Sequence, residues 1–339
     1  MRLEKIRNWY IEKEKIYFAS IELTQNCNFG CKHCYCTGKN TVNLSLEQHY
    51  RIIDKIYDTG CLFINFTGGE IFTNNNFREI YTYAKNKGFI IDLLTNASLI
   101  DEKTIELFCE MPPNNIAITL YGANEGEYRK FTGDGENYKK VMNALELLKH
   151  NNIHFVLRTV AVKTFQESLK KNRFEQIAKI FDTTFKYDPI IFPKISGEKS
   201  PLNERLDVDE IIKLENCNES RKAAWKKMIS SLDQGEFYWR CNAGVNSLVV
   251  DYQGNAFVCG LYRKRPISLL NNDIDTVIEH LREVHQYHCS IVKNNECALC
   301  EKRKICKWCP AYSEIFNGND YTKIDYFCQL AEERMRAFK

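Results

Sequence analysis

No stretch of this sequence approaches the roughly 20 consecutive apolar residues that a membrane-spanning helix requires. The N-terminal segment contains Lys and Arg but no continuous apolar region like that of a secretory signal peptide. Basic residues form no long run, and the formal net charge is only +3, so the sequence lacks the charge pattern of a dedicated nucleic-acid-binding protein. We therefore expect a cytoplasmic protein that binds neither membrane nor nucleic acid and acts on small molecules or peptides.

Cysteine, in contrast, is abundant. The chain contains 15 cysteines, which do not form a disulfide framework in a reducing compartment. Metal binding is the better explanation for so many thiols. The rest of the composition, with 44 % hydrophobic and 12 % aromatic residues, is ordinary for a globular protein and provides enough apolar surface for a core.

Short apolar runs alternate with longer helical patterns from residue 18 to about 195, which is typical of repeated βα units and a parallel sheet. Over 47–57 and 138–148, apolar residues recur at the three- and four-residue spacing of a helix. The expected strands are 19–23, 62–67, 90–94, 116–120, 155–160 and 185–190. Six such units predict an α/β fold with a partial (β/α)6 TIM-like barrel and not a full eight-fold barrel.

The composition becomes polar and rich in turn residues after residue 195, which indicates a boundary. We expect an N-terminal extension over 1–17, the partial barrel over 18–195, a helical connection over 196–237 and a small cysteine-rich domain over 238–339. Within the last of these, Gly254 marks a hairpin turn between two short strands. The apolar runs there are too short for an independent core, so metal is expected to stabilise this domain.

Three cysteines follow the first expected strand within eight positions, namely Cys27, Cys31 and Cys34. Three thiolates suit a [4Fe-4S] cluster with one iron left open, whereas structural zinc sites use four ligands. Zinc, or cysteines that bind no metal, is the alternative interpretation of these residues alone. Their position favours a functional site, because barrel enzymes carry their chemistry at the C-terminal ends of the strands.

The CxxxCxxC spacing, with the aromatic His33 before the third cysteine, resembles the signature loop of radical S-adenosylmethionine (SAM) enzymes. In that family the open iron binds the methionine moiety of SAM, and the reduced cluster cleaves SAM to a 5′-deoxyadenosyl radical that abstracts a hydrogen atom from the substrate. Gly68, Gly69 and Glu70 follow the second expected strand and are similar to the family's GGE motif, which engages the methionine amino group. An ordinary strand-to-helix turn is the alternative.

The resemblance also implies contacts with SAM from other strands. Asn96 and Thr119 fall at the ends of the third and fourth expected strands, where the family places ribose and carboxylate contacts. Arg158 in the fifth strand offers a guanidinium for the carboxylate of SAM, with a structural ion pair as the alternative. Tyr35, directly after the third cysteine, completes the residues expected to bind this cofactor.

The C-terminal part contains a second set of cysteines, and its central run of four could by itself form a zinc ribbon. The full set resembles the SPASM domain of radical SAM enzymes, which binds two auxiliary [4Fe-4S] clusters. One departure is that two residues, and not the usual three, separate Cys306 from Cys309. The resemblance assigns the outer cluster to Cys297, Cys300, Cys306 and Cys328, and the inner cluster to Cys241, Cys259 and Cys309.

The inner cluster is then one ligand short, and five cysteines remain unassigned. We expect Cys217 or Cys289 to supply the missing ligand or to donate a hydrogen atom to a substrate radical, with the substrate itself as another source of the ligand. Cys61 and Cys109 are expected to be small buried hydrophobes, and Cys36 has no assigned role.

The resemblance implies an enzyme, and 118–125 together with 131–133 are similar to segments of its peptide-maturing members. The first hypothesis is therefore modification of a ribosomally synthesised peptide by a thioether or carbon–carbon cross-link or by epimerisation. Auxiliary clusters fit a net two-electron oxidation, because they accept the second electron. The alternatives are a sugar or aminocyclitol dehydrogenase, an anaerobic sulfatase-type maturase, and a zinc- or cluster-binding structural module that is not an enzyme.

Two partners are expected besides the substrate. Reduction of the cluster requires an electron donor such as a flavodoxin or a ferredoxin. Only about twenty residues precede the first expected strand, fewer than a fused leader-binding domain needs, so recognition of a leader peptide would require a separate protein.

Overall fold

The structure is a computed structural model that describes residues 3–36, 41–230 and 241–339. Within these residues, one sheet of nine strands has the order β6-β5-β4-β3-β2-β1-β7-β8-β9. The strands are β1 (Phe18–Thr24), β2 (Phe63–Gly68), β3 (Ile90–Thr95), β4 (Asn115–Thr119), β5 (Phe155–Val160), β6 (Phe185–Asp188), β7 (Ser247–Val250), β8 (Asn255–Phe257) and β9 (Ile267–Ser268). The strands from β6 to β7 pair in parallel, and β8 and β9 add antiparallel pairs.

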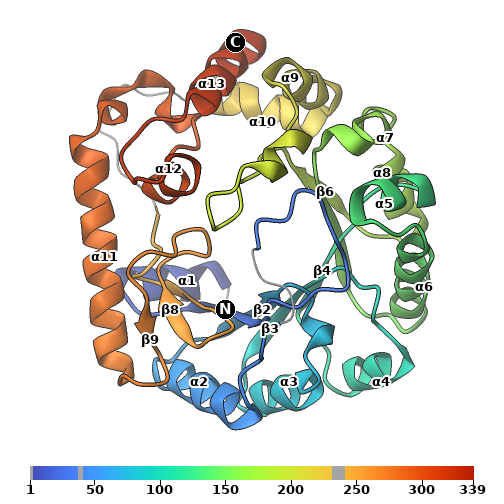
Figure 1. Cartoon of the computed structure of the whole chain (residues 1–339), viewed down its shortest axis with the longest axis vertical. Coiled ribbons are helices and arrows are strands. Elements are labelled where there is room, and N and C mark those ends of the chain that lie inside the picture. The colour runs from blue at the N-terminus through green and yellow to red at the C-terminus, as the bar shows by residue number, and fades with distance from the viewer. Residues whose placement is uncertain (1–2, 37–40, 231–240) are drawn as a thin grey trace.

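Helices surround the sheet, and in Figure 1 α2, α3, α4 and α6 lie along its outside. The helices are α1 (Leu3–Glu12), α2 (Leu46–Asp58), α3 (Phe77–Asn86), α4 (Glu102–Glu110), α5 (Glu125–Thr132), α6 (Glu136–His150), α7 (Gln166–Lys170), α8 (Arg173–Ile180), α9 (Val208–Cys217), α10 (Glu219–Ser230), α11 (Ile274–Asn294), α12 (Pro310–Asn317) and α13 (Asp325–Phe338). The α/β partial barrel is thereby confirmed, and each of the six predicted strands occurs with ends within two residues of the prediction.

The two faces of the sheet differ in polarity. Phe66, Leu93 and Ile116 align across β2, β3 and β4 and are fully buried beneath the helices. The alternate positions, which point to the opposite face, carry polar side chains, as in the aligned set Ser20, Asn65 and Asp92. The interior of the partial barrel therefore contains polar side chains, while its outer face is part of the hydrophobic core.

The cysteine-rich C-terminal segment continues this sheet. Strand β7 pairs in parallel with β1, and Gly254, with a φ of +81°, forms the predicted turn before β8. Leu248, Val250 and Leu281 belong to the same buried cluster as the apolar residues of the barrel. The short apolar runs of this segment therefore join the core of the barrel and do not build a separate one.

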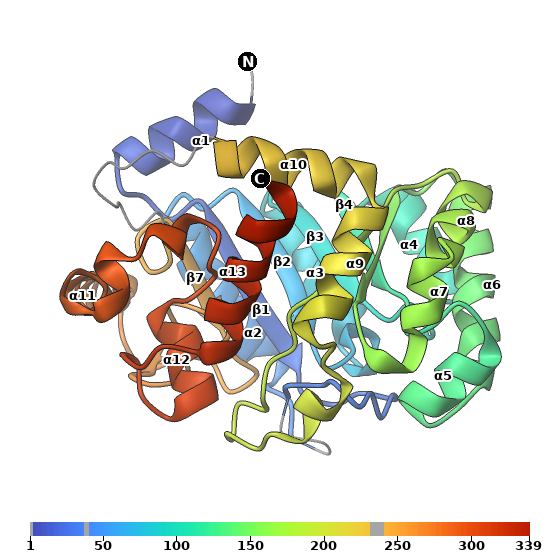
Figure 2. The ribbon, with the colours of Figure 1, turned by 90° about the horizontal axis from the view of Figure 1, so that it is seen from above.

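The expected domain boundaries can be compared with the helices and strands of the structure. Strand β1 begins at Phe18, directly after the expected extension 1–17, and the expected connection 196–237 contains α9 and α10. The predicted boundary between residues 237 and 238 lies outside the described residues. Figure 2 shows α1 and α10 along one edge of the sheet and the loop that follows β1 at the opposite edge. No helix of the described ranges is both long enough and apolar enough to cross a membrane.

Candidate functional site

The predicted GGE turn is joined by hydrogen bonds to the end of β1. The backbone N–H of Gly69 donates to the carbonyl of Thr24 at 2.8 Å, and the N–H of Glu70 donates to the carbonyl of Asn26 at 2.8 Å. The Thr73 hydroxyl donates to the same Asn26 carbonyl at 3.0 Å. The loop after β2 therefore fixes the chain where it leaves β1 and enters the cysteine loop.

Two consecutive glycines make this junction possible. Gly68 has a φ of +144°, and a Cβ atom there would collide with the carbonyl oxygen of Thr24. A Cβ atom on Gly69 would lie 2.6 Å from the carbonyl oxygen of Gln25 and closer still to that of Asn26. Any side chain at either position would therefore separate the two loops.

Glu70 connects the ends of β2 and β3. It is fully buried, and its carboxylate accepts hydrogen bonds of 2.6 Å from the Thr95 hydroxyl and of 2.6 Å from the backbone N–H of Asn96. Burial raises the pKa of Glu70 to about 7, although the hydrogen bonds from Thr95, Asn96 and Phe72 oppose this shift. The carboxylate is thus a strong acceptor held in a site that is poor in water.

Asn96 links Glu70 to the cysteine loop. Its side-chain amide donates to Asn28 at 3.0 Å and lies 4.0 Å from the sulfur of Cys27. The side chain is buried, with 4 % exposed. The structure therefore brings together Cys27, Glu70 and Asn96, three residues that the sequence placed after three different strands.

The three cysteines of the first motif lie within electrostatic range of one another. Burial and the negative charges of Cys34 and Cys27 raise the pKa of Cys31 well above its usual value. The loop that carries them is held by backbone hydrogen bonds from Gly30 and Lys32 to the C-terminal turn of α5. Thiols that repel one another's charge in this way are stabilised as thiolates by a bound metal cation.

Aromatic side chains enclose the cysteine loop. The ring of His33 stacks on Phe131 with centroids 5.1 Å apart and lies 5.7 Å from Tyr121. Burial lowers the pKa of His33 to about 4, so this imidazole is neutral near pH 7. Tyr121 also hydrogen-bonds to Cys31. His33 therefore closes the apolar side of the loop.

Tyr35 and Cys36 extend the site beyond the third cysteine. Cys36, which had no predicted role, hydrogen-bonds to Cys34, and this contact is the main reason why its pKa is raised. Burial raises the pKa of Tyr35, and the charges of Cys36 and Glu22 add to the shift. Tyr35 thus lies between the cysteine loop and the polar interior of the barrel.

Thr119 and Arg158 lie on the inner face of the sheet, in register with each other on β4 and β5. Thr119 is half-buried and Arg158 is exposed. The structure places both side chains on the polar face that lines the interior, and their predicted contacts with SAM remain predictions.

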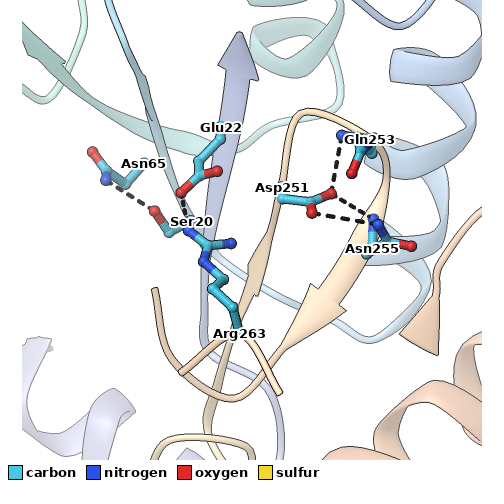
Figure 3. Close-up of polar contacts among 7 residues, drawn as sticks. All are labelled: Ser20, Glu22, Asn65, Asp251, Gln253, Asn255 and Arg263. Atoms are coloured by element: carbon cyan, nitrogen blue, oxygen red, sulfur yellow. Dashed lines mark hydrogen bonds and ion pairs between the residues drawn. The ribbon is translucent and has the colours of Figure 1, made fainter. Parts of the chain in front are cut away.

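A buried ion pair crosses the same interior. Arg263, in the loop after β8, pairs with Glu22 on β1, and the two side chains point toward each other in Figure 3. Burial raises the pKa of Glu22, and the guanidinium partly offsets this effect. The hairpin residue Asp251 lies nearby and accepts hydrogen bonds from the backbone of Gln253 and Asn255 (Figure 3).

The four cysteines assigned to the outer cluster line one cavity of about 240 Å³, which Lys302, Arg303 and Lys323 also line. Burial, followed by the charges of the other three thiols and of Glu296, raises the pKa of Cys297 to about 11. The structure therefore brings together Cys297, Cys300, Cys306 and Cys328.

The three cysteines assigned to the inner cluster form a separate group. Burial, followed by the charges of Cys259 and Cys241, raises the pKa of Cys309 to about 12, although hydrogen bonds to the backbone of α12 oppose the shift. Cys289 on α11 belongs to the same group, because its charge also acts on Cys241. Its sulfur lies 3.4 Å from Nε2 of His285.

The remaining cysteines are dispersed. Cys217 is exposed at the end of α9, and Cys61 is buried as predicted. The prediction that Cys109 is buried is wrong: it is exposed on α4, because the buried face of that helix is formed by Ile105 and Phe108. Across the ranges 3–36, 41–230 and 241–339, no three His, Cys, Asp or Glu side chains converge closely enough to hold a single metal ion.

Sequence reasoning missed two parts of this site. The contact between Glu22 and Arg263 joins residues 241 positions apart, and only an acidic residue on the inner face of an expected strand hinted at it. The hydrogen bond between Cys34 and Cys36 followed a CxC spacing that was visible in the sequence.

Comparison with known proteins identifies the first part of the chain. Residues 21–171 match the model of the Radical SAM superfamily. The antilisterial bacteriocin subtilosin biosynthesis protein AlbA of Bacillus subtilis (strain 168) is 24 % identical over 252 residues, which cover 73 % of this chain and 55 % of AlbA. This chain therefore spans about half the length of AlbA.

Two further similarities extend over nearly the whole chain. An AdoMet-dependent heme synthase of Methanosarcina barkeri (strain Fusaro / DSM 804) is 23 % identical over 339 residues, which cover 91 % of this chain and 94 % of the synthase. The crystal structure of Streptococcus suis SuiB bound to precursor peptide SuiA has a TM-score of 0.74 at 14 % identity and covers 97 % of this chain and 80 % of SuiB. That likeness concerns the fold.

The family implies a [4Fe-4S] cluster and SAM as cofactors. The fold, the cysteine loop after β1 and the match over residues 21–171 agree. The match covers residues 21–171, so this part of the chain is a radical SAM domain, and a cysteine-rich C-terminal region follows it.

Proposed function

We propose that this enzyme modifies a ribosomally synthesised peptide by a thioether or carbon–carbon cross-link or by epimerisation. AlbA is a biosynthesis protein of the antilisterial bacteriocin subtilosin, and SuiB was crystallised with a precursor peptide. The polar interior of the partial barrel and the cavity that Arg263 lines would receive the peptide segment. A flavodoxin or ferredoxin as electron donor, and a separate protein for leader recognition, belong to the same proposal.

One observation supports the radical chemistry in this proposal: the cysteine loop, the GGE turn and Asn96 converge at one edge of the parallel sheet. Cys27, Cys31 and Cys34 would hold the cluster that binds SAM. When bound, these cofactors supply a radical that removes a hydrogen atom from the substrate. The loop that carries Glu70 would receive the methionine amino group, as the likeness to the GGE motif implies, with the Glu70 carboxylate fixing the loop through its hydrogen bonds to Thr95 and Asn96.

The chain's own residues would shape the surroundings of this reaction. His33, stacked on Phe131, would shield one side of the cysteine loop from water. Gly68 and Gly69 bring the Glu70 loop against the cysteine loop, and Asn96 holds Glu70 in register with it. Tyr35, Thr119 and Arg158 would contact SAM from the inner side.

The grouping of the C-terminal thiols supports two auxiliary clusters. Four cysteines line one 240 Å³ cavity, together with the cationic side chains of Lys302, Arg303 and Lys323 and the carboxylate of Glu296. The second group consists of Cys241, Cys259 and Cys309, with Cys289 beside them. With the first cluster, the chain would bind about twelve iron atoms.

The activity is tested by anaerobic mass spectrometry in deuterated buffer with reconstituted enzyme, dithionite, SAM and the peptide fraction of the source cells. We expect 5′-deoxyadenosine together with a peptide that loses two hydrogens, or one that gains a single non-exchangeable deuterium. Cys31→Ala should abolish both products and remove about four of the about twelve iron atoms. Cys109→Ala, an exposed thiol outside every group, is the matched control. Cleavage of SAM without a change in any peptide would contradict the proposal.

A second candidate function is modification of a tetrapyrrole. It is favoured by the heme synthase relative, whose similarity extends over 91 % of this chain and 94 % of its own length. Adding an iron porphyrin that carries four carboxylates to the same assay distinguishes the two, because only the second candidate predicts a change in the mass of the porphyrin.

Cys289 is expected to be the fourth ligand of the inner cluster. Its sulfur belongs to the group of Cys241, Cys259 and Cys309, and it lies 3.4 Å from Nε2 of His285, whose Nδ1 is 3.0 Å from the carbonyl of Ala243. Cys289→Ser should lower the iron content from about twelve to about eight atoms per chain, as measured by iron and sulfide analysis and Mössbauer spectroscopy. Cys217→Ser, in the exposed α9 thiol, should leave twelve. Full iron content with an unchanged spectrum in the first variant would exclude Cys289.

A further inference from the structure

Arg263 is fixed on two sides inside the barrel. Its Nη2 pairs with Glu22, and its guanidinium lies over the ring of Phe257 at 4.9 Å (Figure 3 shows the pair with Glu22). Only 15 % of the Arg263 side chain and 8 % of the Glu22 side chain are exposed. The guanidinium is therefore held in one orientation, away from bulk water.

The rest of the guanidinium has no acceptor. Its Nε and Nη1 atoms are buried without a hydrogen-bond partner among the residues that the structure describes. These two nitrogens carry three of the five N–H donors of the group, and arginine has no acceptor of its own. Buried donors are normally paired, and since no described residue supplies an acceptor, the arrangement favours an oxygen acceptor provided by a bound ligand. The planar fork of a guanidinium suits a carboxylate.

Arg263 also lines a cavity that is large enough for a ligand. The cavity has a volume of about 760 Å³ and contains the basic side chains of Lys199 and Lys264 as well as Arg263. Glu314, the one carboxylate that lines it, lies 2.8 Å from Lys264. The cavity is therefore positively charged on balance, and its size is typical of small-molecule and peptide side-chain pockets.

The same cavity adjoins the cysteine loop. Ile195, which lines it, donates its backbone N–H to the carbonyl of Tyr35 at 2.9 Å. The charges of Glu22 and Arg263 both act on Tyr35 and on Cys36. A group bound to Arg263 would therefore be anchored beside the loop that follows β1.

From these observations, we propose that Arg263 binds a carboxylate of the substrate and that Glu22 positions the guanidinium for it. Under the proposed function, on which this inference rests, the carboxylate belongs to an acidic side chain or to the C-terminus of the peptide. The propionate of a tetrapyrrole has the same chemistry and is the other source of such a group.

The subsite is tested by binding to the anaerobically reconstituted holoenzyme without reductant, so that no reaction occurs. The probes are a fluorescein-labelled peptide with two central Glu residues and a C-terminal amide, its Gln counterpart, and the Glu peptide with a free C-terminus. Fluorescence anisotropy gives each Kd. A porphyrin dicarboxylate and its dimethyl ester, followed by absorbance, form the second arm.

We expect the wild type to prefer the Glu peptide, or the peptide with a free C-terminus, over its neutral counterpart by about tenfold or more in Kd. Arg263→Gln alone would leave Glu22 buried without its partner, so the informative variant is Glu22→Gln with Arg263→Gln. Its two amides can still hydrogen-bond, and its net charge equals that of the wild type. This variant should reduce the preference to less than about twofold.

Arg265→Gln is the matched control. It lies two residues further along the same loop, and its guanidinium stacks on Tyr287 and does not line the cavity. This variant lowers the net charge by one but should keep the preference for the acidic probes. Loss of the preference in it would show that the total charge, and not Arg263, decides binding.

The outcomes separate the two proposals. Equal binding of every acid and its neutral counterpart, or a preference that survives in the double variant, would overturn the subsite. A preference confined to the porphyrin acid would support the subsite and contradict a peptide substrate. Failure of the wild type to cleave SAM, measured separately with dithionite, would contradict the proposed function without bearing on carboxylate binding.

Discussion

Replacing Arg334 with methionine is expected to lower the free energy of unfolding by about 3–5 kcal/mol, because it leaves Glu215 as a buried charge without a partner. Nε and Nη2 of Arg334 donate to the two carboxylate oxygens of Glu215 at 3.0 and 2.6 Å. The side chains are only 3 % and 0 % exposed. Arg334 also lies over the ring of Trp225 at 4.2 Å, so its removal loses packing as well.

The measurement is urea unfolding followed by circular dichroism, where a lower midpoint at an unchanged m-value reports a loss of stability. Arg336→Met is the matched control in the same helix. Arg336 pairs with Glu333, but 68 % of its side chain is exposed, so its loss should cost less than about 1 kcal/mol. Equal losses for the two variants would show that the buried pair has no special role.

One partner of the ion pair between Glu215 and Arg334 lies close in sequence to the outer group of cysteines. Glu215 is on α9, in the connection after the barrel, and Arg334 is on α13, which also carries Cys328. The ion pair therefore fixes the helix that brings Cys328 to the other three thiols of the outer group. If this group holds an auxiliary cluster, as proposed above, a destabilised variant should also lose iron from it before it unfolds.

Local pattern was sufficient to predict the parallel strands. Alternating burial and aligned apolar positions, as in Phe66, Leu93 and Ile116, follow from the sequence of each strand and its neighbours. The capping box of α2 is equally local, with Ser45 and Gln48 exchanging hydrogen bonds at its start. Such features depend on residues only a few positions apart, so the sequence displays them directly.

The sequence could not show contacts that depend on how the elements pack. Glu22 and Arg263 meet only because β7 pairs with β1 and brings the C-terminal hairpin to the barrel. Cys109 was predicted to be buried because free cysteines usually are. It is exposed because it lies outside the buried face of α4. The grouping of the C-terminal thiols was predicted from family resemblance, and the structure brings the same residues together.

Gly69→Ala is expected to reduce SAM cleavage about 100-fold, because a displacement of about 1 Å at a reacting site has an effect of this size. The new Cβ atom would meet the backbone carbonyl oxygens of Gln25 and Asn26, which no side-chain rotation can move away. Relief requires separation of the two loops, and that separation breaks the hydrogen bonds from Gly69 to Thr24 and from Glu70 to Asn26.

The same change should lower the free energy of unfolding by only about 1–3 kcal/mol, the usual range for overpacking. Gly126→Ala provides the control, because Gly126 lies in α5, where its nearest neighbour is the side-chain oxygen of the capping residue Asn124 at 3.2 Å and not a backbone atom. Alanine favours a helix over glycine, so this variant should be neutral or slightly more stable.

Measuring 5′-deoxyadenosine formation and iron content for both variants separates local from global damage. A Gly69→Ala enzyme that keeps its iron but cleaves SAM slowly would show that the glycine positions Glu70 against the cysteine loop. A variant with the wild-type rate would contradict this role. It would show that the junction accommodates a Cβ atom despite the nearby backbone oxygens. Loss of iron together with loss of activity would show that the cysteine loop itself is damaged, because Asn26, which accepts the hydrogen bond from Glu70, directly precedes Cys27.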